Sequence, residues 1–419
     1  MGHLTDEVTA SMSGSAFVPI IESLLDTDLY KFTMWQAMLH RHPAAQAEYR
    51  FICRTRPERP LALLVDEVQQ QIDHLCSLRF HQDELDYLGK LRYIKPDFVD
   101  FLSLFHFQRR FIEVGADGEG LSIVARGPQV HVMAFEIFVL AIINELYFRR
   151  YDTPEVRAEG RRRLQAKIDL LRDFSHEPGR RFPLQISDFG LRRRFSRNWQ
   201  AEVLKTLRAQ VPQYVTGTSN VALARECDLV PVGTMAHEYL QSYQAFGKVR
   251  LRDFQRTALE DWVQEYRGDL GVALTDVVGM KAFLTDFDLY LAKLFDGLRH
   301  DSGDPIDWGE QAIAHYQALR IDPATKRFVF SDGLDLPQAL RIYRHFADRV
   351  QLAFGIGTNL SNDLGPEPLN IVMKLFYCNG MPTAKLPDSP GKVHCTDATF
   401  LAYLRQVFDR QDAPSPTGA

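Results

Sequence analysis

From about residue 183 onward, one pattern recurs along the chain. A short apolar run of β-favouring residues ends in a polar or glycine-rich tip, and a helical segment usually follows it. The tips are residues 187–190, 216–219, 233–237, 275–276, 300–304, 331–333 and 355–358. Strands that alternate with helices form parallel sheets, in which the carboxyl ends of the strands share one edge. The pattern therefore predicts an α/β barrel with its reactive groups at one rim.

The spacing of these units is irregular. Some links are too short for a complete helix, and a long stretch separates the tip at 233–237 from the next strong helical pattern at 253–266. Eight equal strand–helix units would not produce such gaps. We therefore expect an irregular, incomplete barrel.

The first third of the chain has a mixed pattern instead. Its expected elements are a helix at 30–40, a strand at 47–54, helices within 60–105, two strands around the turn at 116–120, and helices at 134–151 and 155–172. This mixture predicts a smaller α+β domain in the N-terminal part.

The expected domain boundaries follow from these patterns. Residues 1–15 are expected to be a disordered tail, 16–147 the N-terminal α+β domain, 148–400 the barrel domain with the active site, and 401–419 a C-terminal helix and tail. Two β-like pieces, 371–377 and 383–386, follow the barrel strands. The segment after residue 370 is therefore a candidate to pack with the N-terminal domain.

Composition narrows the class of protein. The formal net charge of -5 over 419 residues argues against a general nucleic-acid binder. The five cysteines form no CxxC pair, so neither a disulfide framework nor a zinc site is expected, and a reducing cytoplasm fits. The most apolar stretch, 130–148, contains His131, Glu136, Asn144 and Glu145, which predicts a buried helix rather than a membrane span. We expect a cytoplasmic protein without nucleic-acid or membrane partners, since the N-terminus also lacks the pattern of a secretory signal.

Several short motifs are incomplete. Residues 188–190 spell the metal-binding motif of protein kinases, but no kinase catalytic loop precedes them. His237 begins a segment like a zinc-protease helix, yet Gln241 stands where the second histidine ligand belongs. The arginine runs 161–163 and 192–194 are expected to be solvated helix faces. None of these features by itself indicates a function.

Together, the tips place one chemically consistent set of side chains at the predicted rim. Arginine offers a planar donor fork to phosphate or carboxylate, aspartate accepts hydrogen bonds from sugar hydroxyls, and Ser, Thr and Gly present donors to phosphate oxygens. The set is Phe189, Arg192, Thr218, Ser219, His237, Arg299, Asp301, Ser302, Asp332, Gly333, Gly355 and Gly357. It suits an anionic, polyhydroxylated substrate, although any single Asp or Ser in it is equally well explained as a helix N-cap.

Seven segments of the chain resemble, in order, the signature segments of nicotinate phosphoribosyltransferases. They are LDTDLYKFTM at 25–34, DFGLRRR at 188–194, GTSN at 217–220, GTMAHE at 233–238, RHDSGD at 299–304, SDGL at 331–334 and AFGIGT at 353–358. The resemblance covers about residues 22–395. It implies a type II phosphoribosyltransferase-like fold, in which an irregular α/β barrel is joined to a smaller α+β N-terminal domain.

The resemblance also implies an activity and roles for individual residues. In the family, ATP phosphorylates the histidine that matches His237, and the phosphoenzyme drives synthesis of nicotinate mononucleotide and pyrophosphate from nicotinate and phosphoribosyl pyrophosphate, a step of NAD salvage. The implied catalytic residues are His237, Arg299, Asp301 and Asp332. The implied nicotinate contacts are Tyr30, Phe189, Arg192, Thr218 and Ser219. The implied phosphoribosyl and phosphate contacts are Ser302, Gly303, Gly333, Gly355, Gly357 and Thr358.

Cofactors and partners follow from the same resemblance. ATP is a co-substrate, and Mg²⁺ is expected on substrate oxygens rather than in a cage of protein ligands. Many family members are homodimers with shared sites, so Tyr30 is expected to cross the interface and stack on the pyridine ring opposite Phe189. Lys374, Lys385 and Lys392 are candidates to add positive charge to the site, although exposed lysine is the default.

Other interpretations remain open at this stage. Considered alone, Tyr30 would be a core residue and His237 a structural histidine. Nicotinamide and quinolinate phosphoribosyltransferases have the same fold, and Ser219 with Arg192 favours a substrate that carries a carboxylate. A catalytically inactive regulatory homologue is disfavoured by the intact rim set. Residues 277–278, both valine, depart from the family pattern, and we give that loop no role.

Overall fold

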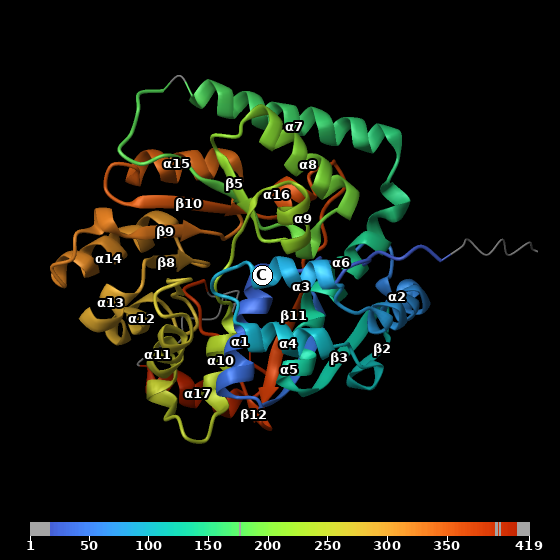
Figure 1. Ribbon diagram of the computed structural model, residues 1–419, viewed down its shortest axis with the longest axis horizontal. Coiled ribbons are helices and arrows are strands. Elements are labelled where there is room, and N and C mark those ends of the chain that lie inside the picture. The colour runs from blue at the N-terminus through green and yellow to red at the C-terminus, as the bar shows by residue number, and fades with distance from the viewer. Residues whose placement is uncertain (1–16, 176, 390–392, 394, 409–419) are drawn as a thin grey trace, which may run out of the picture.

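The computed structural model describes residues 17–175, 177–389, 393 and 395–408, and two sheets organise them (Figure 1). A seven-stranded sheet with its helices forms one part, and a five-stranded sheet packed against long helices forms the other. The tail expected at 1–15, the end of the tail expected at 401–419 and Lys392 lie outside the described residues.

The larger sheet consists of seven parallel strands in the order β6-β5-β4-β10-β9-β8-β7. The strands are β4 (Ile186–Asp188), β5 (Val215–Thr218), β6 (Val230–Pro231), β7 (Val272–Leu274), β8 (Gly297–His300), β9 (Arg327–Phe330) and β10 (Gln351–Ile356). Phe328, Phe330 and Phe354 are fully buried, because helices cover the sheet as they cover most parallel sheets. All seven predicted strands are confirmed.

The larger sheet curls but does not close. Its edge strands β6 and β7 share no ladder among the described residues, and the Thr234 hydroxyl donates to the Val272 carbonyl across the gap at 2.9 Å. β6 has only two residues, and the chain after it forms the short helix α10 instead of another strand. The expected irregular, incomplete barrel is therefore confirmed.

Helices follow most of the strands, and aspartates cap two of the longest. The caps of α14 and α15 are Asp304 and Asp335, which accept bonds from first-turn N–H groups. The rim residues Asp301 and Asp332 are not these caps. The helices of this part are α7 (Pro154–Phe174), α8 (Arg197–Gln210), α9 (Val221–Glu226), α10 (His237–Ser242), α11 (Phe254–Tyr266), α12 (Met280–Asp286), α13 (Leu289–Leu294), α14 (Pro305–Ala318), α15 (Leu336–Phe346), α16 (Thr358–Ser361) and α17 (Ala398–Val407).

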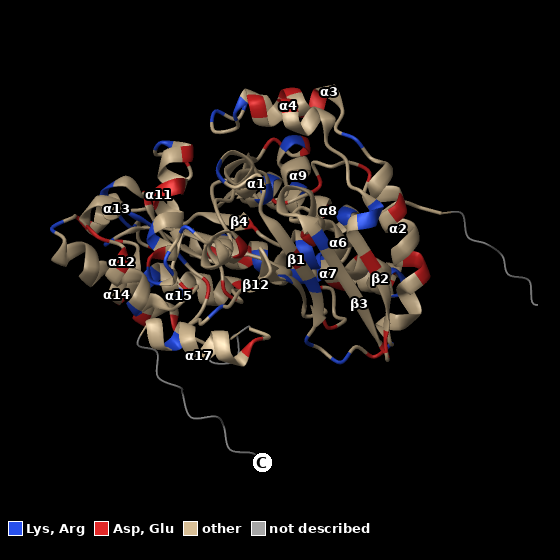
Figure 2. Cartoon of the chain, turned by 90° about the horizontal axis from the view of Figure 1, so that it is seen from below, with Lys and Arg blue, Asp and Glu red and all other residues tan. Residues whose placement is uncertain are grey.

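The smaller sheet is antiparallel, with the order β12-β11-β1-β3-β2. Its strands are β1 (Gln46–Cys53), β2 (Ile112–Asp117), β3 (Gly120–Pro128), β11 (Ile371–Cys378) and β12 (Met381–Pro382). Its helices are α1 (Leu29–Arg41), α2 (Val65–Ser77), α3 (Gln82–Gly89), α4 (Pro96–Leu104), α5 (Gln129–Val132) and α6 (Phe135–Phe148). The chain thus returns after the barrel to add β11 beside β1. Figure 2 shows this sheet beside the barrel helices, with acidic and basic residues interspersed.

The prediction of a β-like piece at 383–386 is wrong. The strand is β12, and the residues after it bond mainly to the barrel instead of extending the strand. The Ala384 N–H donates to the Gln244 side chain at 2.9 Å, and the Leu386 N–H donates to the Val277 carbonyl at 2.7 Å. These bonds tie the segment after β12 to the rim of the barrel.

The apolar stretch around α6 lies in the core. The helical segment Gln129–Tyr151 is long and apolar enough to cross a membrane, but 89% of its most apolar window is buried inside the protein. Glu136 and Asn144 of α6 are buried and bond to other parts of the chain. These contacts agree with the prediction of a buried helix.

The two arginine runs have different surroundings. Arg161 and Arg162 pair with carboxylates at the surface, as expected. Arg194, in contrast, is fully buried. The prediction that residues 192–194 form a solvated face is therefore wrong for Arg194. Its guanidinium donates to both carboxylate oxygens of Asp26 at 2.7 and 2.8 Å and to Glu145 at 2.7 Å. Since Asp26 and Glu145 precede the barrel in sequence, this bidentate pair joins the two parts of the protein.

We expect Arg194→Met to lower the free energy of unfolding by about 3–5 kcal/mol, because it leaves the carboxylates of Asp26 and Glu145 buried without their cation. Denaturant unfolding of the full chain measures this change. The matched control is Arg162→Met, which removes an exposed, solvent-screened pair and should leave the free energy of unfolding almost unchanged. Equal effects of the two substitutions would contradict the structural role of Arg194.

Candidate active site

A cavity of about 420 Å³ lies where the rim of the barrel meets α1, α6 and β11. The tips of the barrel strands supply one side of it, and the N-terminal helices and β11 supply the other. The predicted residues that line it are Tyr30, Phe189, Arg192, Ser219, His237, Arg299, Asp301, Asp332, Gly333, Gly357 and Thr358. The fold therefore gathers residues from distant parts of the sequence around a single cavity.

Thr218 and Ser302 are not among the residues that line the cavity, and their contact with a ligand stays a prediction. The Thr218 hydroxyl donates to Asp188 at 2.8 Å, and the Ser302 hydroxyl donates to Asp276 at 2.7 Å. Both hydroxyl-bearing residues are almost completely buried. They orient carboxylates beneath the rim.

Gly303 and Gly355 also lie outside the cavity lining. A Cβ added at Gly355 would lie 2.2 Å from the ring of Phe189, so this glycine makes room for the ring. Gly303 has φ +87°, donates its N–H to the Ser389 hydroxyl at 3.0 Å and accepts a bond from His300. The two glycines therefore shape the rim, and their direct contact with phosphate stays a prediction.

Two aromatic residues of the same chain line the cavity. Phe189 follows β4, and Tyr30 stands in the first turn of α1. The start of α1 is fixed to the rim because the Leu29 N–H donates to the Ser219 carbonyl at 2.8 Å. Both rings therefore line a cavity of a single chain. The expectation that Tyr30 crosses a subunit interface stays a prediction.

Carboxylates surround Arg192 at the same end of the cavity. Its Nη1 lies 3.3 Å from Glu136 Oε1, and Asp28 accepts a bond from the Ser219 hydroxyl at 2.6 Å. Burial raises the pKa of Asp28 to about 6, although Arg192 opposes the shift. The Arg192 side chain is thus partly exposed, so its guanidinium is accessible to a ligand carboxylate. Acidic neighbours offset part of its positive charge.

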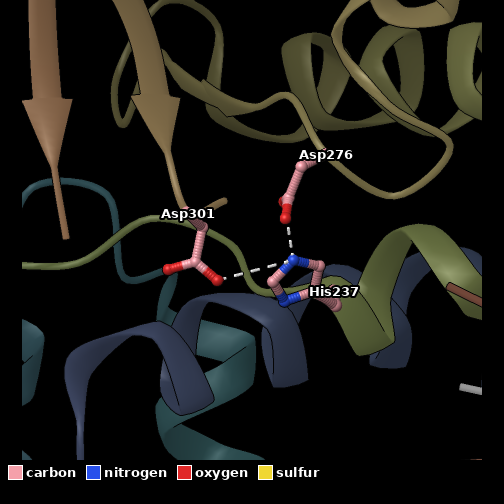
Figure 3. A group of neighbouring side chains, drawn as sticks. All are labelled: His237, Asp276 and Asp301. Carbon is pink, nitrogen blue, oxygen red and sulfur yellow. Dashed lines mark hydrogen bonds and ion pairs between the residues drawn. The ribbon is translucent and has the colours of Figure 1, made fainter. Parts of the chain in front are cut away.

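His237 stands at the start of α10 and faces two carboxylates (Figure 3). Its Nε2 lies 2.7 Å from Asp276 and 3.7 Å from Asp301. The Lys385 ammonium lies 2.8 Å from the other oxygen of Asp276. Burial, with Lys385 as a second cause, lowers the pKa of His237, so the imidazole is neutral at pH 7.

This geometry distinguishes the two imidazole nitrogens. Burial raises the pKa of Asp276, but its pairing with His237 and Lys385 holds that pKa well below the ordinary value. The ionised carboxylate therefore accepts a hydrogen bond from the Nε2–H of His237. The lone pair then resides on Nδ1. A neutral imidazole held in one tautomer is a competent nucleophile.

The ligand atoms of His237, Asp276 and Asp301 lie within 4.8 Å of one another, which raises the question of a metal. Mg²⁺ prefers oxygen ligands and retains several waters. Here an imidazole forms part of the set, and Lys385 already neutralises Asp276. The cluster therefore does not fit a Mg²⁺ cage and is better described as an ion-paired histidine.

Sequence reasoning missed or left open several residues of the cavity. Lys374 and Lys385, the candidates to add charge to the site, line it, and the Lys385 side chain is only 9% exposed. Arg54 and Arg193 also line it. Burial lowers the pKa of Arg193 to about 10, with Arg192 and Arg54 contributing, which shows that these cations lie close together. Asp276 could have been found, since it ends a predicted strand tip.

Comparison with known proteins shows the family of this chain. Residues 184–412 match the nicotinate phosphoribosyltransferase family, and residues 25–144 match the N-terminal domain of that family. A nicotinate phosphoribosyltransferase of Herminiimonas arsenicoxydans is 67% identical over 93% of this chain and 98% of its own length. The chain belongs to the nicotinate phosphoribosyltransferase family.

Solved structures of family members have the same fold. The nicotinate phosphoribosyltransferase of Vibrio cholerae has a TM-score of 0.89 at 41% identity, over 94% of this chain and 95% of that one. The enzyme of Porphyromonas gingivalis has a TM-score of 0.86 at 36% identity, over 93% of this chain and 100% of that one. The irregular barrel joined to an α+β part is therefore the architecture of the family.

Mixing two inactive variants of this protein tests whether the Tyr30 and Phe189 rings of one site come from the same chain. Tyr30→Ala and Phe189→Ala should each lower kcat/KM for nicotinate by roughly tenfold or more, because each removes a buried ring contact. Mixed after subunit exchange, the two variants should stay as inactive as each alone. Recovery of activity on mixing would show that the rings of one site come from two chains.

Proposed function

We propose that this enzyme joins nicotinate to the phosphoribosyl group of phosphoribosyl pyrophosphate and that ATP drives the reaction through phosphorylated His237. The observation that carries the ATP-dependent step is the neutral imidazole of His237, bonded to Asp276 in the same cavity as Tyr30, Phe189 and Arg192. A nucleophile and a site for an aromatic acid thus share one cavity.

In the phosphorylation step, His237 Nδ1 attacks the γ-phosphorus of ATP. An N–P bond forms, the bond from the γ-phosphorus to the bridging oxygen breaks, and ADP leaves with the electron pair. The proton stays on Nε2, hydrogen-bonded to the Asp276 carboxylate, which stabilises the positive charge that develops on the ring. Lys385 offsets part of the negative charge of the phosphoryl group.

In the transfer step, the pyridine nitrogen of nicotinate attacks the anomeric carbon while the carbon–oxygen bond to pyrophosphate breaks. Positive charge develops on the ribose ring, so positioning and electrostatics dominate catalysis. Tyr30 and Phe189 hold the flat ring, and Arg192 receives its carboxylate. Asp301 and Asp332 are assigned to the ribose hydroxyls. The phosphates are assigned to Arg54, Arg193, Arg299, Gly333, Gly357, Thr358 and Lys374.

Mg²⁺ is proposed as a companion of the substrate rather than a resident of the protein. When bound to the pyrophosphate oxygens, it would shield the leaving group. We also propose a cytoplasmic location, which accords with five free cysteines. We also propose that the protein is a homodimer in which each chain supplies both Tyr30 and Phe189 to its own cavity.

Labelled ATP tests the phosphohistidine directly. The wild-type enzyme incubated with γ-labelled ATP should acquire an acid-labile, base-stable label, and His237→Ala should abolish it. Asp276→Asn should slow labelling by roughly 10²-fold or more, because the tautomer and the developing charge lose their partner. A label that survives His237→Ala would contradict the proposed nucleophile, even in an enzyme that still forms product.

A further inference from the structure

The segment that leads to His237 lies directly against α1. The Thr33 hydroxyl donates to the Thr234 carbonyl at 2.6 Å, and the Ala236 N–H donates to the sulfur of Met34 at 3.1 Å. A Cβ added at Gly233 would come within 3.0 Å of the Tyr30 nitrogen. Movement of the segment 233–238 is therefore transmitted to the start of α1, which carries Tyr30.

A buried ionic cluster strengthens the same contact. Lys31 follows Tyr30, and its side chain is 1% exposed. Its ammonium lies 2.6 Å from Glu136 of α6 and also pairs with Glu238, the residue that follows His237. Lys31 thus joins the helix that carries one ring of the nicotinate site to the helix that carries the proposed nucleophile.

The cluster continues to Arg192. Glu136 uses its second oxygen, Oε1, to face the Arg192 guanidinium at 3.3 Å. The order of contacts is therefore Arg192, Glu136, Lys31 and Glu238, with His237 next in the chain. Both glutamates line the cavity, so charged groups bound there act on them directly.

The charges of this cluster depend on one another. Lys31 is shared between the two glutamates, and Glu136 is shared between Lys31 and Arg192. A nicotinate carboxylate on Arg192 would compete with Glu136 for that cation. Glu136 would then draw more strongly on Lys31 and weaken its pairing with Glu238. A phosphoryl group on His237 adds about two negative charges beside Glu238 and perturbs the same cluster from its other end. Buried ion pairs respond strongly to such changes because little water screens them.

We propose that Lys31 is a positioning residue that couples nicotinate binding to phosphorylation of His237. The inference rests on the proposed function, since it requires both events to occur in this cavity. Coupling between two sites is reciprocal, so it can be measured from either end. We measure the coupling as a ratio: the level of phosphorylated His237 with saturating nicotinate divided by the level without nicotinate.

The experiment uses the full-length enzyme and γ-labelled ATP. In wild type, nicotinate should change the steady-state level of label on His237 by about fivefold or more. In Lys31→Met the ratio should fall to nearly one, and Lys31→Arg should restore part of the change. The matched control is Lys326→Met, which removes another buried lysine at the amino end of β9, remote from the cavity. This control should keep the wild-type ratio.

A second variant covers the case in which Lys31→Met does not fold. Lys31→Met combined with Glu136→Gln and Glu238→Gln removes all three charges together and leaves no buried carboxylate without a partner. It should also have a ratio near one. A wild-type ratio in either folded variant would overturn the inference, because it would show that the two ligands interact directly across the cavity. A ratio of one in the wild type would overturn it as well.

The wild-type arm separates this inference from the proposed function. Absence of any label on wild-type His237 would contradict the phosphohistidine itself. A normal label whose response to nicotinate is unchanged by loss of Lys31 would contradict only the role of Lys31.

Discussion

The attachment of α1 to the rim of the barrel is the contact on which the site depends. Backbone bonds from the segment 25–29 to residues 219–222 fix the start of the helix, and the bonds of Thr33 and Met34 fix its next turn. Without this attachment the rim would lack the side of the cavity that α1 supplies. With it, Tyr30 and Phe189 line one cavity.

Buried charge is the second requirement of this arrangement. Asp26 with Arg194, and Lys31 with Glu136 and Glu238, lie at the junction where α1 meets the rest of the protein. Burying a charge is costly unless it is paired, so each group depends on a partner from another segment. These pairs make the junction specific. At the site, burial keeps His237 neutral, and the pairing with His237 and Lys385 keeps Asp276 ionised.

Much of the fold and of the site could be predicted from the sequence because strand tips carry a local signal. Seven apolar runs predicted seven parallel strands, and most rim residues line the cavity. The errors concern properties that depend on tertiary partners. A serine at a strand tip gives no sign of whether it lines the cavity, like Ser219, or lies beneath the rim, like Ser302. Arg194 resembles surface charge until Asp26 and Glu145 are placed beside it.

The central claim is that residues of one chain enclose the pyridine and phosphoribosyl groups together. A crystal structure with bound nicotinate mononucleotide tests it most directly. We expect the pyridine ring between Tyr30 and Phe189 of the same chain, its carboxylate at Arg192 and the phosphate among Arg54, Arg193 and the tip at 355–358. Density for the nucleotide outside this cavity, or a ring stacked on the tyrosine of another chain, would contradict the account.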